Sequence, residues 1–143
     1  MENFIFSQKL CYKMAEAAQK VQEELGVSIC MSISDKHGNL RYFYRFGEAI
    51  VPSIDISQKK AYTAAVLGQS TRAFGKIAQV NGEAFGINIT HPKLVIFGGG
   101  FPLKVKGETV GGLGISGGSV AEDEAVAQKT LEAFYQETGQ THG

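Results

Sequence analysis

Apolar residues recur every three or four positions in the first part of the chain, between Ser7 and Leu25. The stripe consists of Leu10, Met14, Ala17, Ala18, Val21 and Leu25. This spacing is close to the 3.6-residue period of a helix, so it predicts one amphipathic helix over the segment. Gly26 follows directly, and a glycine there is typical of a helix end because it adopts the left-handed conformation without strain.

Two segments with the two-residue period of a strand come next. Val27–Ser34 alternates apolar side chains with serine and cysteine, and Leu40–Phe46 is rich in aromatic residues. The polar run Asp35–Asn39 between them contains a glycine and favours a turn. We therefore expect a β-hairpin.

A second helix is predicted from Pro52 to about Gln69. Its inner stripe is made of small residues, which are Ala61, Ala64, Ala65 and Gly68. Small side chains let a helix lie close against a sheet, although each of them buries little area. Thr71 is expected to cap a short third helix, and residues 81–93, with two glycines and a proline, predict a long loop.

Three further strands and one helix are predicted in the last third of the chain. The strands are Leu94–Phe97, Phe101–Val105 and Thr109–Ile115. Ser119 and Glu122 have the spacing of a capping box, which begins the last helix. Because hairpin connections dominate, we expect an α+β fold with helices on the faces of a largely antiparallel sheet of about five strands. The chain is expected to form a single domain over residues 1–143, ending in a polar tail at 138–143.

Composition narrows the class of partner. The chain has 143 residues, of which 43% are hydrophobic, so it can form one globular domain. Fourteen basic and fourteen acidic residues cancel, so we do not expect nucleic acid as a partner.

Uncharged runs are shorter than the ~20 residues of a membrane helix, and the N-terminus lacks the pattern of a signal peptide. Cys11 and Cys30 are expected to be buried free thiols, with a disulfide or a reactive thiol as the alternatives, which favours the cytoplasm.

Two catalytic signatures overlap in the glycine-rich segment, and the rest of the chain completes neither. The segment 112–117 spells GxGxxG, but a dinucleotide fold also needs a further parallel strand and an acidic residue ~20 positions on. The segment 114–118 spells GxSxG around Ser116, with Asp123 and His142 in the order of a hydrolase triad. Asp123 is explained by the helix dipole, and His142 lies in the tail, where a base is not held rigidly.

The same region predicts a different kind of site. Three consecutive glycines remove side-chain bulk, so backbone N–H groups can approach a ligand, and the following helix entry adds further N–H groups. We predict a pocket for a carboxylate or similar anion, with two cationic side chains nearby; the alternative is a pair of tight turns and solvated surface cations. The predicted ligand-binding residues are Arg45, Lys60, Gly98, Gly99, Gly100, Phe101, Pro102, Ser116 and Gly117.

The three histidines lack the spacing of a zinc site. Haem iron needs only one or two protein side chains, so the sequence leaves such a group open. His37, in a turn, and His91, before a proline, are the candidate metal ligands.

Taken in order, these motifs resemble those of the GlcG/HbpS-like family, which includes the C-terminal domain of PduO-type proteins. The ordered set is Asp35-x-x-Gly38-Asn39-Leu40, Arg45, Ala49, Lys60-Ala61-x-Thr63-Ala64, Thr71, Gly99-Gly100-x-Pro102-Leu103, Gly111-Gly112-x-Gly114-x-Ser116-Gly117-Gly118 and Asp123. The resemblance extends from about residue 7 to 135. It implies a profilin-like α/β/α sandwich that forms dimers and larger homo-oligomers, up to octamers.

Some members of this family bind haem and are linked to redox sensing and haem degradation, whereas others are encoded beside glycolate use or cobalamin-dependent diol and glycerol dehydratase systems. The resemblance therefore implies a non-enzymatic small-ligand binding protein, with haem or a corrinoid as the ligand. An oligomeric accessory protein of such an operon is one alternative, and a small enzyme acting on an organic acid or on haem is another. One relative holds iron by a histidine on the first helix, but this chain has none before His37. Its iron ligand is then expected from His37, His91, a tyrosine, a methionine or a neighbouring subunit.

Overall fold

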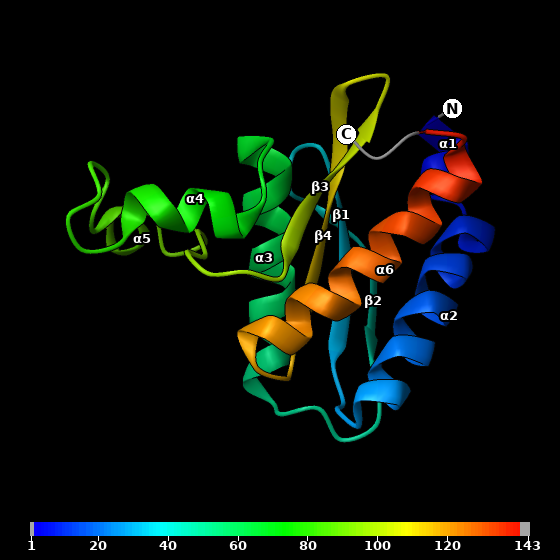
Figure 1. The fold of residues 1–143 in the computed structure, drawn as a ribbon. Coiled ribbons are helices and arrows are strands. Elements are labelled where there is room, and N and C mark those ends of the chain that lie inside the picture. The colour runs from blue at the N-terminus through cyan, green and yellow to red at the C-terminus, as the bar shows by residue number, and fades with distance from the viewer. Residues whose placement is uncertain (1, 141–143) are drawn as a thin grey trace.

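The computed structural model describes residues 2–140 of the chain, which form an antiparallel four-stranded sheet with helices on both faces (Figure 1). The strand order is β2-β1-β4-β3. The strands are β1 (Cys30–Asp35), β2 (Leu40–Arg45), β3 (Gly100–Val105) and β4 (Glu108–Ser116). The helices are α1 (Glu2–Ile5), α2 (Gln8–Leu25), α3 (Pro52–Leu67), α4 (Thr71–Ala78), α5 (Ile87–Thr90) and α6 (Val120–Thr138). The predicted α+β class is confirmed.

Helices α2 and α6 lie side by side and cover one face of the sheet. Helix α6 begins at the predicted cap, and α2 begins at a cap that the sequence analysis did not name. The Ser7 hydroxyl accepts a hydrogen bond from the Leu10 N–H (3.2 Å), and Ser119 and Glu122 form the full capping box. The main core lies between these helices and the sheet, and its fully buried members include Leu10, Met14, Met31, Ile33, Leu113, Ile115 and Phe134.

Helix α3 covers the other face, and it lies close to the sheet because small residues meet on both sides, as the sequence predicted. On β4, a Cβ atom added to Gly114 would lie 2.6 Å from the backbone nitrogen of Ala61. On β1, the Ser32 hydroxyl is 2.8 Å from the Ser57 hydroxyl. Gly112 and Gly114, the first two glycines of the GxGxxG sequence, therefore allow a helix to pack directly on the sheet.

The predicted fifth strand, Leu94–Phe97, is absent, so the sheet has four strands. Here the Val95 N–H donates to the Thr63 hydroxyl of α3 (2.9 Å) and not to another strand. A Cβ on Gly75 of α4 would overlap the Ile96 carbonyl, so α4 packs against this backbone. Leu94 and Val95 are buried and Phe97 is exposed, so the segment is a partly buried connection that contacts α3 and α4 and not a strand of the sheet.

Between residues 70 and 93, the structure differs from the sequence prediction in two details. Ser70, and not Thr71, caps α4, because its hydroxyl accepts from the Ala73 N–H at 3.1 Å. The predicted loop at 81–93 contains the short helix α5.

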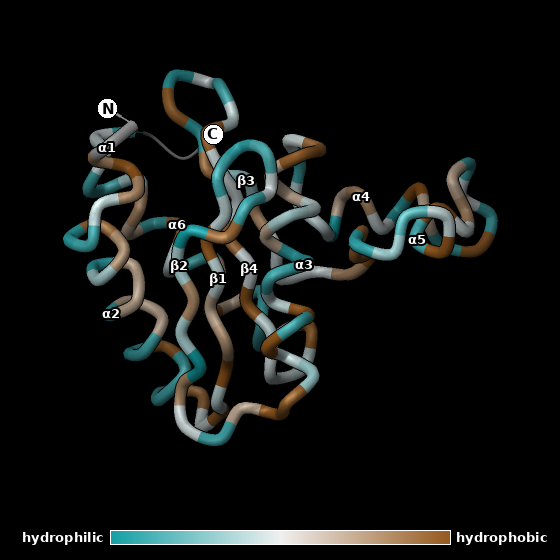
Figure 2. Tube along the Cα trace, turned by 180° about the vertical axis from the view of Figure 1, so that it is seen from behind, coloured by the Kyte–Doolittle hydropathy of each residue, from teal (hydrophilic) through white to brown (hydrophobic). Residues whose placement is uncertain are grey.

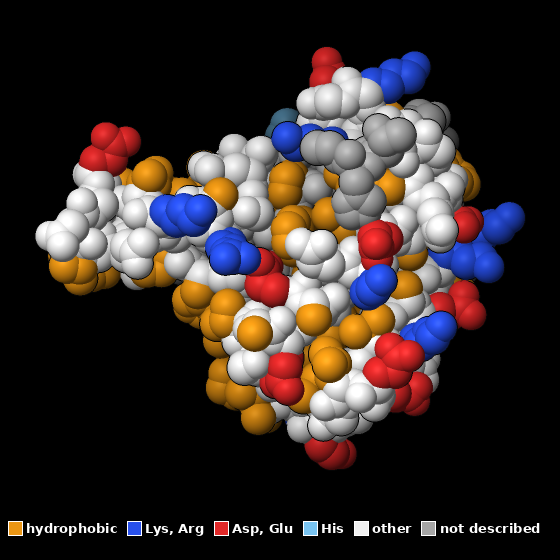
Figure 3. Space-filling model, in the orientation of Figure 1, with side chains coloured by type: hydrophobic (Ala, Val, Ile, Leu, Met, Phe, Trp, Pro, Cys, Tyr) orange, Lys and Arg blue, Asp and Glu red, His pale blue; other side chains and the backbone are white. Residues whose placement is uncertain are grey.

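Residues 71–93, which we call the arm, project beyond the body of the molecule (Figure 1). Figure 2 shows hydrophobic positions interspersed along the arm. Its exposed large apolar residues are Ile77, Val80, Phe85 and Ile89. In the space-filling view, apolar side chains gather on one side of the arm and on the body next to it (Figure 3). None of the helices described is long and apolar enough to cross a membrane.

Candidate functional site

Lys60 is the charged residue at the centre of the glycine-rich region. It lies on the face of α3 that meets the sheet, and it is 0% exposed. Its ammonium donates to the Ile115 carbonyl (2.8 Å) and to Asp123 Oδ2 (3.0 Å), and the Phe97 ring centre is 5.3 Å away. The charge is therefore satisfied inside the protein, and the alternative of a solvated surface lysine is wrong.

Asp123 is the buried partner of this lysine. Its other carboxylate oxygen accepts from the Gly118 N–H at 2.9 Å. Burial lowers the pKa of Lys60 and raises the pKa of Asp123, because a dry environment disfavours both charged forms; each charge opposes the shift of the other. The helix dipole alone does not explain Asp123, because its carboxylate closes a buried ion pair that joins α3 to the start of α6.

The glycines at 98–100 lie against this pair. The Gly99 N–H donates to Glu124 Oε2 (2.8 Å), and the Gly100 N–H donates to the Thr71 hydroxyl (2.9 Å). A Cβ on Gly99, which has φ +120°, would lie 2.5 Å from Lys60 Nζ. The missing side chains thus make room for protein groups, and two N–H groups proposed for an anion already have protein acceptors. Anion binding at Gly98–Gly100 stays a prediction.

The other predicted residues of this segment occupy three environments. Phe101 and Pro102 border a shallow cavity of about 300 Å³ that also includes Ser70 and Tyr135. The buried Ser116 hydroxyl donates to the Ser53 hydroxyl at 3.2 Å. Gly117, with φ +148°, packs against the backbone of residues 28 and 29. Ligand binding by these residues also stays a prediction.

Arg45 closes the loop that leads from β2 to α3. Its Nε and Nη2 both donate to the Ala49 carbonyl, at 2.9 and 2.7 Å. Cys30 pairs with Arg45 on one side and with Ser116 on the other, so Arg45 and Ser116 share one end of the sheet. The structure therefore places the predicted residues Arg45 and Ser116 at the same level of the sheet, on either side of Cys30.

The structure agrees with the exclusion of the dinucleotide signature, whereas the exclusion of the hydrolase triad stays a prediction. In the described residues, β4 runs antiparallel to both neighbours and no parallel strand follows α6. Ser116 meets a serine hydroxyl, and Asp123 meets a lysine, instead of a histidine. His142 lies outside the described residues.

The two candidate metal ligands are exposed and belong to different surroundings. His37 lies in the β1–β2 turn, where its backbone N–H donates to Asp35 Oδ1 at 2.9 Å. His91 follows α5, and its Nε2 is 3.2 Å from the Tyr62 hydroxyl of α3. Sequence reasoning missed the tyrosine because 29 positions separate the two residues. Over residues 2–140, no group of three or more His, Cys, Asp or Glu side chains is placed to hold a metal ion.

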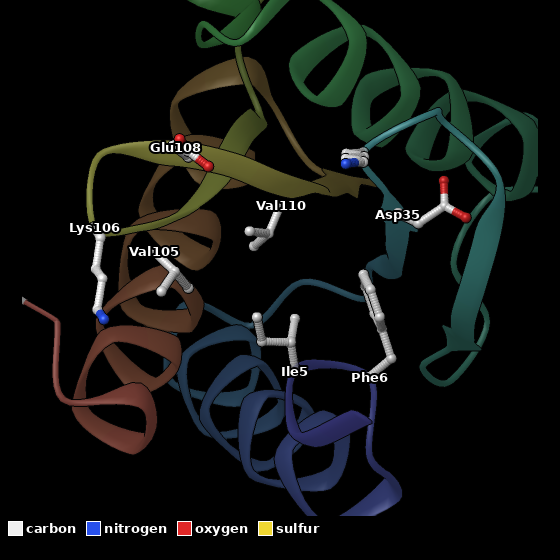
Figure 4. A pocket seen from close by; sticks show the side chains of 8 residues that line it. Ile5, Phe6, Asp35, Val105, Lys106, Glu108 and Val110 are labelled. Atoms are coloured by element: carbon white, nitrogen blue, oxygen red, sulfur yellow. The ribbon is translucent and has the colours of Figure 1, made fainter. Parts of the chain in front are cut away.

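A cavity of about 490 Å³ lies beside the β3–β4 hairpin (Figure 4). Ile5 and Phe6 form one wall, and Val105 and Val110 face them from the hairpin. Charged side chains of Asp35, Lys36, Lys106 and Glu108 also line it. Sequence reasoning missed this cavity because the segment before Ser7 had no predicted element.

A second groove, of about 440 Å³, has an aromatic lining. Tyr42, Tyr44 and Phe46 come from β2 and the residue after it, and Tyr12 comes from α2. The Tyr12 and Tyr42 rings meet edge to face at 6.4 Å. Alternation on β2 places the three aromatic residues on one face, which the sequence pattern predicts, but the contribution of Tyr12 requires the packing of α2.

These features define a small α+β protein in which one helix packs on a glycine-lined sheet through a buried Lys–Asp pair. Comparison with known families gives the class: the model for "Haem degrading protein HbpS-like" matches residues 6–132. The chain belongs to this HbpS-like family, as the ordered motifs implied.

Three relatives illustrate the range of the family. An uncharacterised 15.0 kDa protein of Citrobacter freundii, from the dhaT-dhaS intergenic region, is 37% identical, and the match covers 85% of this chain and 87% of that protein. The corrinoid adenosyltransferase PduO of Salmonella typhimurium is 34% identical over 86% of this chain, which spans only 37% of that longer protein. The crystal structure of a PduOC:heme complex has a TM-score of 0.85 at 34% identity, covering 89% of this chain and 93% of the other.

Proposed function

We propose that the protein binds a tetrapyrrole, specifically haem, as a small-ligand binding protein. The observation that carries the proposal is the similarity of nearly the whole fold to a relative solved as a haem complex. The family description, which names haem, supports the same class of ligand. The adenosyltransferase name of PduO is not transferred, because the chain spans a minor part of that protein.

The donor groups of this chain fit haem better than they fit a bare metal ion. A closed site for a bare ion uses about four side-chain ligands, and the described residues offer no group of even three. Haem brings four nitrogen ligands of its own and needs one or two from the protein. Exposed imidazole and phenol groups are present in His37, His91, Tyr12 and Tyr44. When bound, haem supplies an iron centre, while the protein controls its ligands and its access to water.

Titration with hemin tests the proposal directly. We expect a saturable shift of the Soret band when purified protein is added to hemin, with a dissociation constant in the micromolar range or below. A spectrum identical to that of free hemin at saturating protein would overturn the proposal. A parallel titration with aquacobalamin separates haem from the corrinoid alternative, since a corrinoid site shifts the cobalamin spectrum and leaves that of hemin unchanged.

We also propose that the protein is a homo-oligomer that uses the arm as an interface, and that it acts in the cytoplasm. On the arm, Val80, Phe85 and Ile89 are 70%, 66% and 81% exposed. Apolar side chains that gather on one projecting element are typical of a surface covered by a partner. The free thiols of Cys11 and Cys30 support a reducing compartment.

A further inference from the structure

The cavity beside the β3–β4 hairpin (Figure 4) shares no lining residue with the surroundings of the buried ion pair. Ile5 is 3% exposed and belongs to the main core, and Phe6 packs against that core. Val105 and Val110 reach the same space from the two strands of the hairpin. The walls are therefore apolar side chains fixed by the core. The volume of about 490 Å³ lies within the ~300–1,000 Å³ that small-molecule sites occupy.

The turn of the hairpin places a lysine beside this cavity in a conformation that favours other residue types. Lys106 has φ +53° and Gly107 has φ +81°, so both lie in the left-handed region, as a two-residue hairpin turn requires. Glycine, asparagine and aspartate adopt this region more readily than lysine does. The Lys106 N–H donates to Gln140 Oε1 at 2.8 Å, which ties the turn to the residues that follow α6. The fold thus holds this lysine at a conformational cost, and residues of that kind cluster at functional sites.

Two unpaired lysines line the cavity. Lys106 and Asp35 lie on opposite sides of it (Figure 4), and Lys36 follows Asp35, so the two lysines approach the cavity from different sides. Among the described residues, neither lysine forms an ion pair. Asp35 is occupied by its own turn, because its carboxylate accepts from the backbone N–H groups of His37 and Asn39 and from the Asn39 side-chain amide. The lysines are therefore available to a ligand.

The remaining charges around the cavity leave an excess of cations. Glu108 lines the cavity as an exposed side chain, with no ion pair among the described residues. Arg41 Cζ lies 4.2 Å from the centre of the Phe6 ring, so a guanidinium adjoins the aromatic wall. The two lysines and Arg41 thus face two carboxylates, one of which is already held by its own turn. A ligand with an apolar body and an anionic group complements this lining.

We propose that this cavity binds a small amphipathic carboxylate, of the class of medium-chain fatty acids, at a site separate from the proposed haem site. The apolar chain lies between Phe6 and the two valines, and its carboxylate pairs with Lys36 or Lys106. No histidine, tyrosine, cysteine or methionine is among the described lining residues, so the cavity lacks the side chains that hold haem iron. Binding uses apolar contact and charge, without a covalent step. The inference goes beyond the proposed haem binding and does not depend on it.

Two other cavities suit such a carboxylate less. The aromatic groove at Tyr12 has the acidic Glu16 as its charged lining residue. A groove of about 670 Å³ between α2 and α6 has as many glutamates as lysines in its lining, and Lys129 there is paired with Glu132 at 3.3 Å. Of the three cavities, the one at the hairpin alone combines apolar walls with an excess of cations.

The experiment titrates decanoate into the ¹⁵N-labelled wild-type protein and follows the backbone amides by NMR. We expect saturable shifts at Phe6, Lys36 and residues 105–110, with a dissociation constant below about 1 mM. Decylammonium has the same chain and the opposite charge, and it is expected to bind at least about 10-fold more weakly.

A variant without the two lysines tests their part in binding. In Lys36→Ala/Lys106→Asn, asparagine tolerates the left-handed conformation of the turn, so the hairpin is kept. Decanoate is expected to bind this variant about fivefold to tenfold more weakly, because two exposed charge contacts are lost. Lys13→Ala removes an exposed lysine of α2 that does not line the cavity, and it should bind decanoate as the wild type does.

Several results would overturn the inference. Shifts that do not saturate by roughly 10 mM decanoate, or that lie on another surface, would show that the cavity is not a carboxylate site. Equal binding of decylammonium would show that charge plays no part. If the same amides shift when the protein alone is diluted, a second copy covers the cavity and the inference is wrong.

A hemin titration of the decanoate complex separates this inference from the proposed function. Hemin that displaces decanoate would show one shared site and overturn the separate one. A protein that binds decanoate in the cavity but does not bind hemin keeps the inference and loses the proposed function. The wild-type shifts decide the question even if the lysine variant is unstable, and the ¹⁵N spectrum of each variant checks its fold.

Discussion

Lys60 and Asp123 show why a residue's type alone is a poor guide to its position here. Lysine is almost never fully buried unless it is paired, so the surface was the natural expectation. Its partner lies 63 positions away, on an element that only the tertiary fold brings to α3. No local pattern reveals such a pair. What the sequence did contain was both residues within the ordered family motifs.

Removing one member of this pair should destabilise the protein strongly. Lys60→Met leaves a buried carboxylate without its cation, and Asp123→Asn leaves a buried ammonium without its anion. Each is expected to reduce the free energy of unfolding by about 3–5 kcal/mol, because an unpaired buried charge loses its hydration without compensation. Urea denaturation followed by circular dichroism measures both changes.

The double variant Lys60→Met/Asp123→Asn tests whether the pairing, and not the space it fills, carries this stability. With neither charge present, the loss should be well below the sum of the two single losses, so the double-mutant cycle gives a coupling of at least about 1 kcal/mol. Lys59→Met removes the neighbouring lysine, whose exposed pair with Asp55 (3.0 Å) is expected to contribute less than about 1 kcal/mol. Additive single losses would show that the pair does not act as a unit.

At the scale of elements, the sequence predicted most of the fold because its local patterns agree with the tertiary structure. The period of α2, the capping box of α6 and the small-residue stripe of α3 all appear at the predicted positions. The segment 94–97 was misassigned because an apolar run is common to a strand and to a buried connection, and only the hydrogen bond to Thr63 distinguishes them. Gly98–Gly100 was predicted to face a ligand, and what the sequence did not reveal is that helices α3, α4 and α6 approach these glycines. Ligand binding there stays a prediction.

Gly114→Ala should disturb the packing of α3 on the sheet. The new Cβ would lie 2.6 Å from the backbone nitrogen of Ala61 and would also meet the Ser57 carbonyl, and backbone atoms cannot move aside cheaply. We expect a loss of about 1–3 kcal/mol in the free energy of unfolding, the usual cost of overpacking. The measurement is a urea denaturation curve with unchanged slope.

Gly98→Ala is the matched control for Gly114→Ala. Its Cβ would lie 2.8 Å from Glu124, but here the neighbouring atom belongs to the end of a side chain that can rotate. We therefore expect a smaller loss than for Gly114→Ala. Equal losses would mean that the close approach of α3 is not what makes Gly114 necessary.

At the scale of the whole molecule, the candidate site was only partly open to prediction. His91 and an unspecified tyrosine were candidate iron ligands from the sequence, but the sequence did not predict that Tyr62 lies beside His91, because only the fold brings the residue after α5 to α3. The projection of the arm was equally hidden, since each of its short apolar stretches resembles an ordinary core segment. The sequence pattern around a hydrophobic residue does not tell whether the residue is buried in the core of its own chain or against a second copy. Only the complete fold distinguishes the two.

Charged substitutions on the arm should dissociate the proposed oligomer without unfolding the protein. Phe85 and Ile89 are strongly exposed on the arm, so Phe85→Glu/Ile89→Lys removes apolar area from the interface, while exposed positions tolerate such changes within about 0.5 kcal/mol of stability. Light scattering coupled to size-exclusion chromatography is expected to give the wild type a multiple of 15.4 kDa and the double variant a single chain mass. Leu25→Lys, at a 42% exposed position on α2, should leave the wild-type mass unchanged. A monomeric wild type at micromolar concentration, or an oligomer that survives both substitutions, would show that another surface or no partner copy covers the arm.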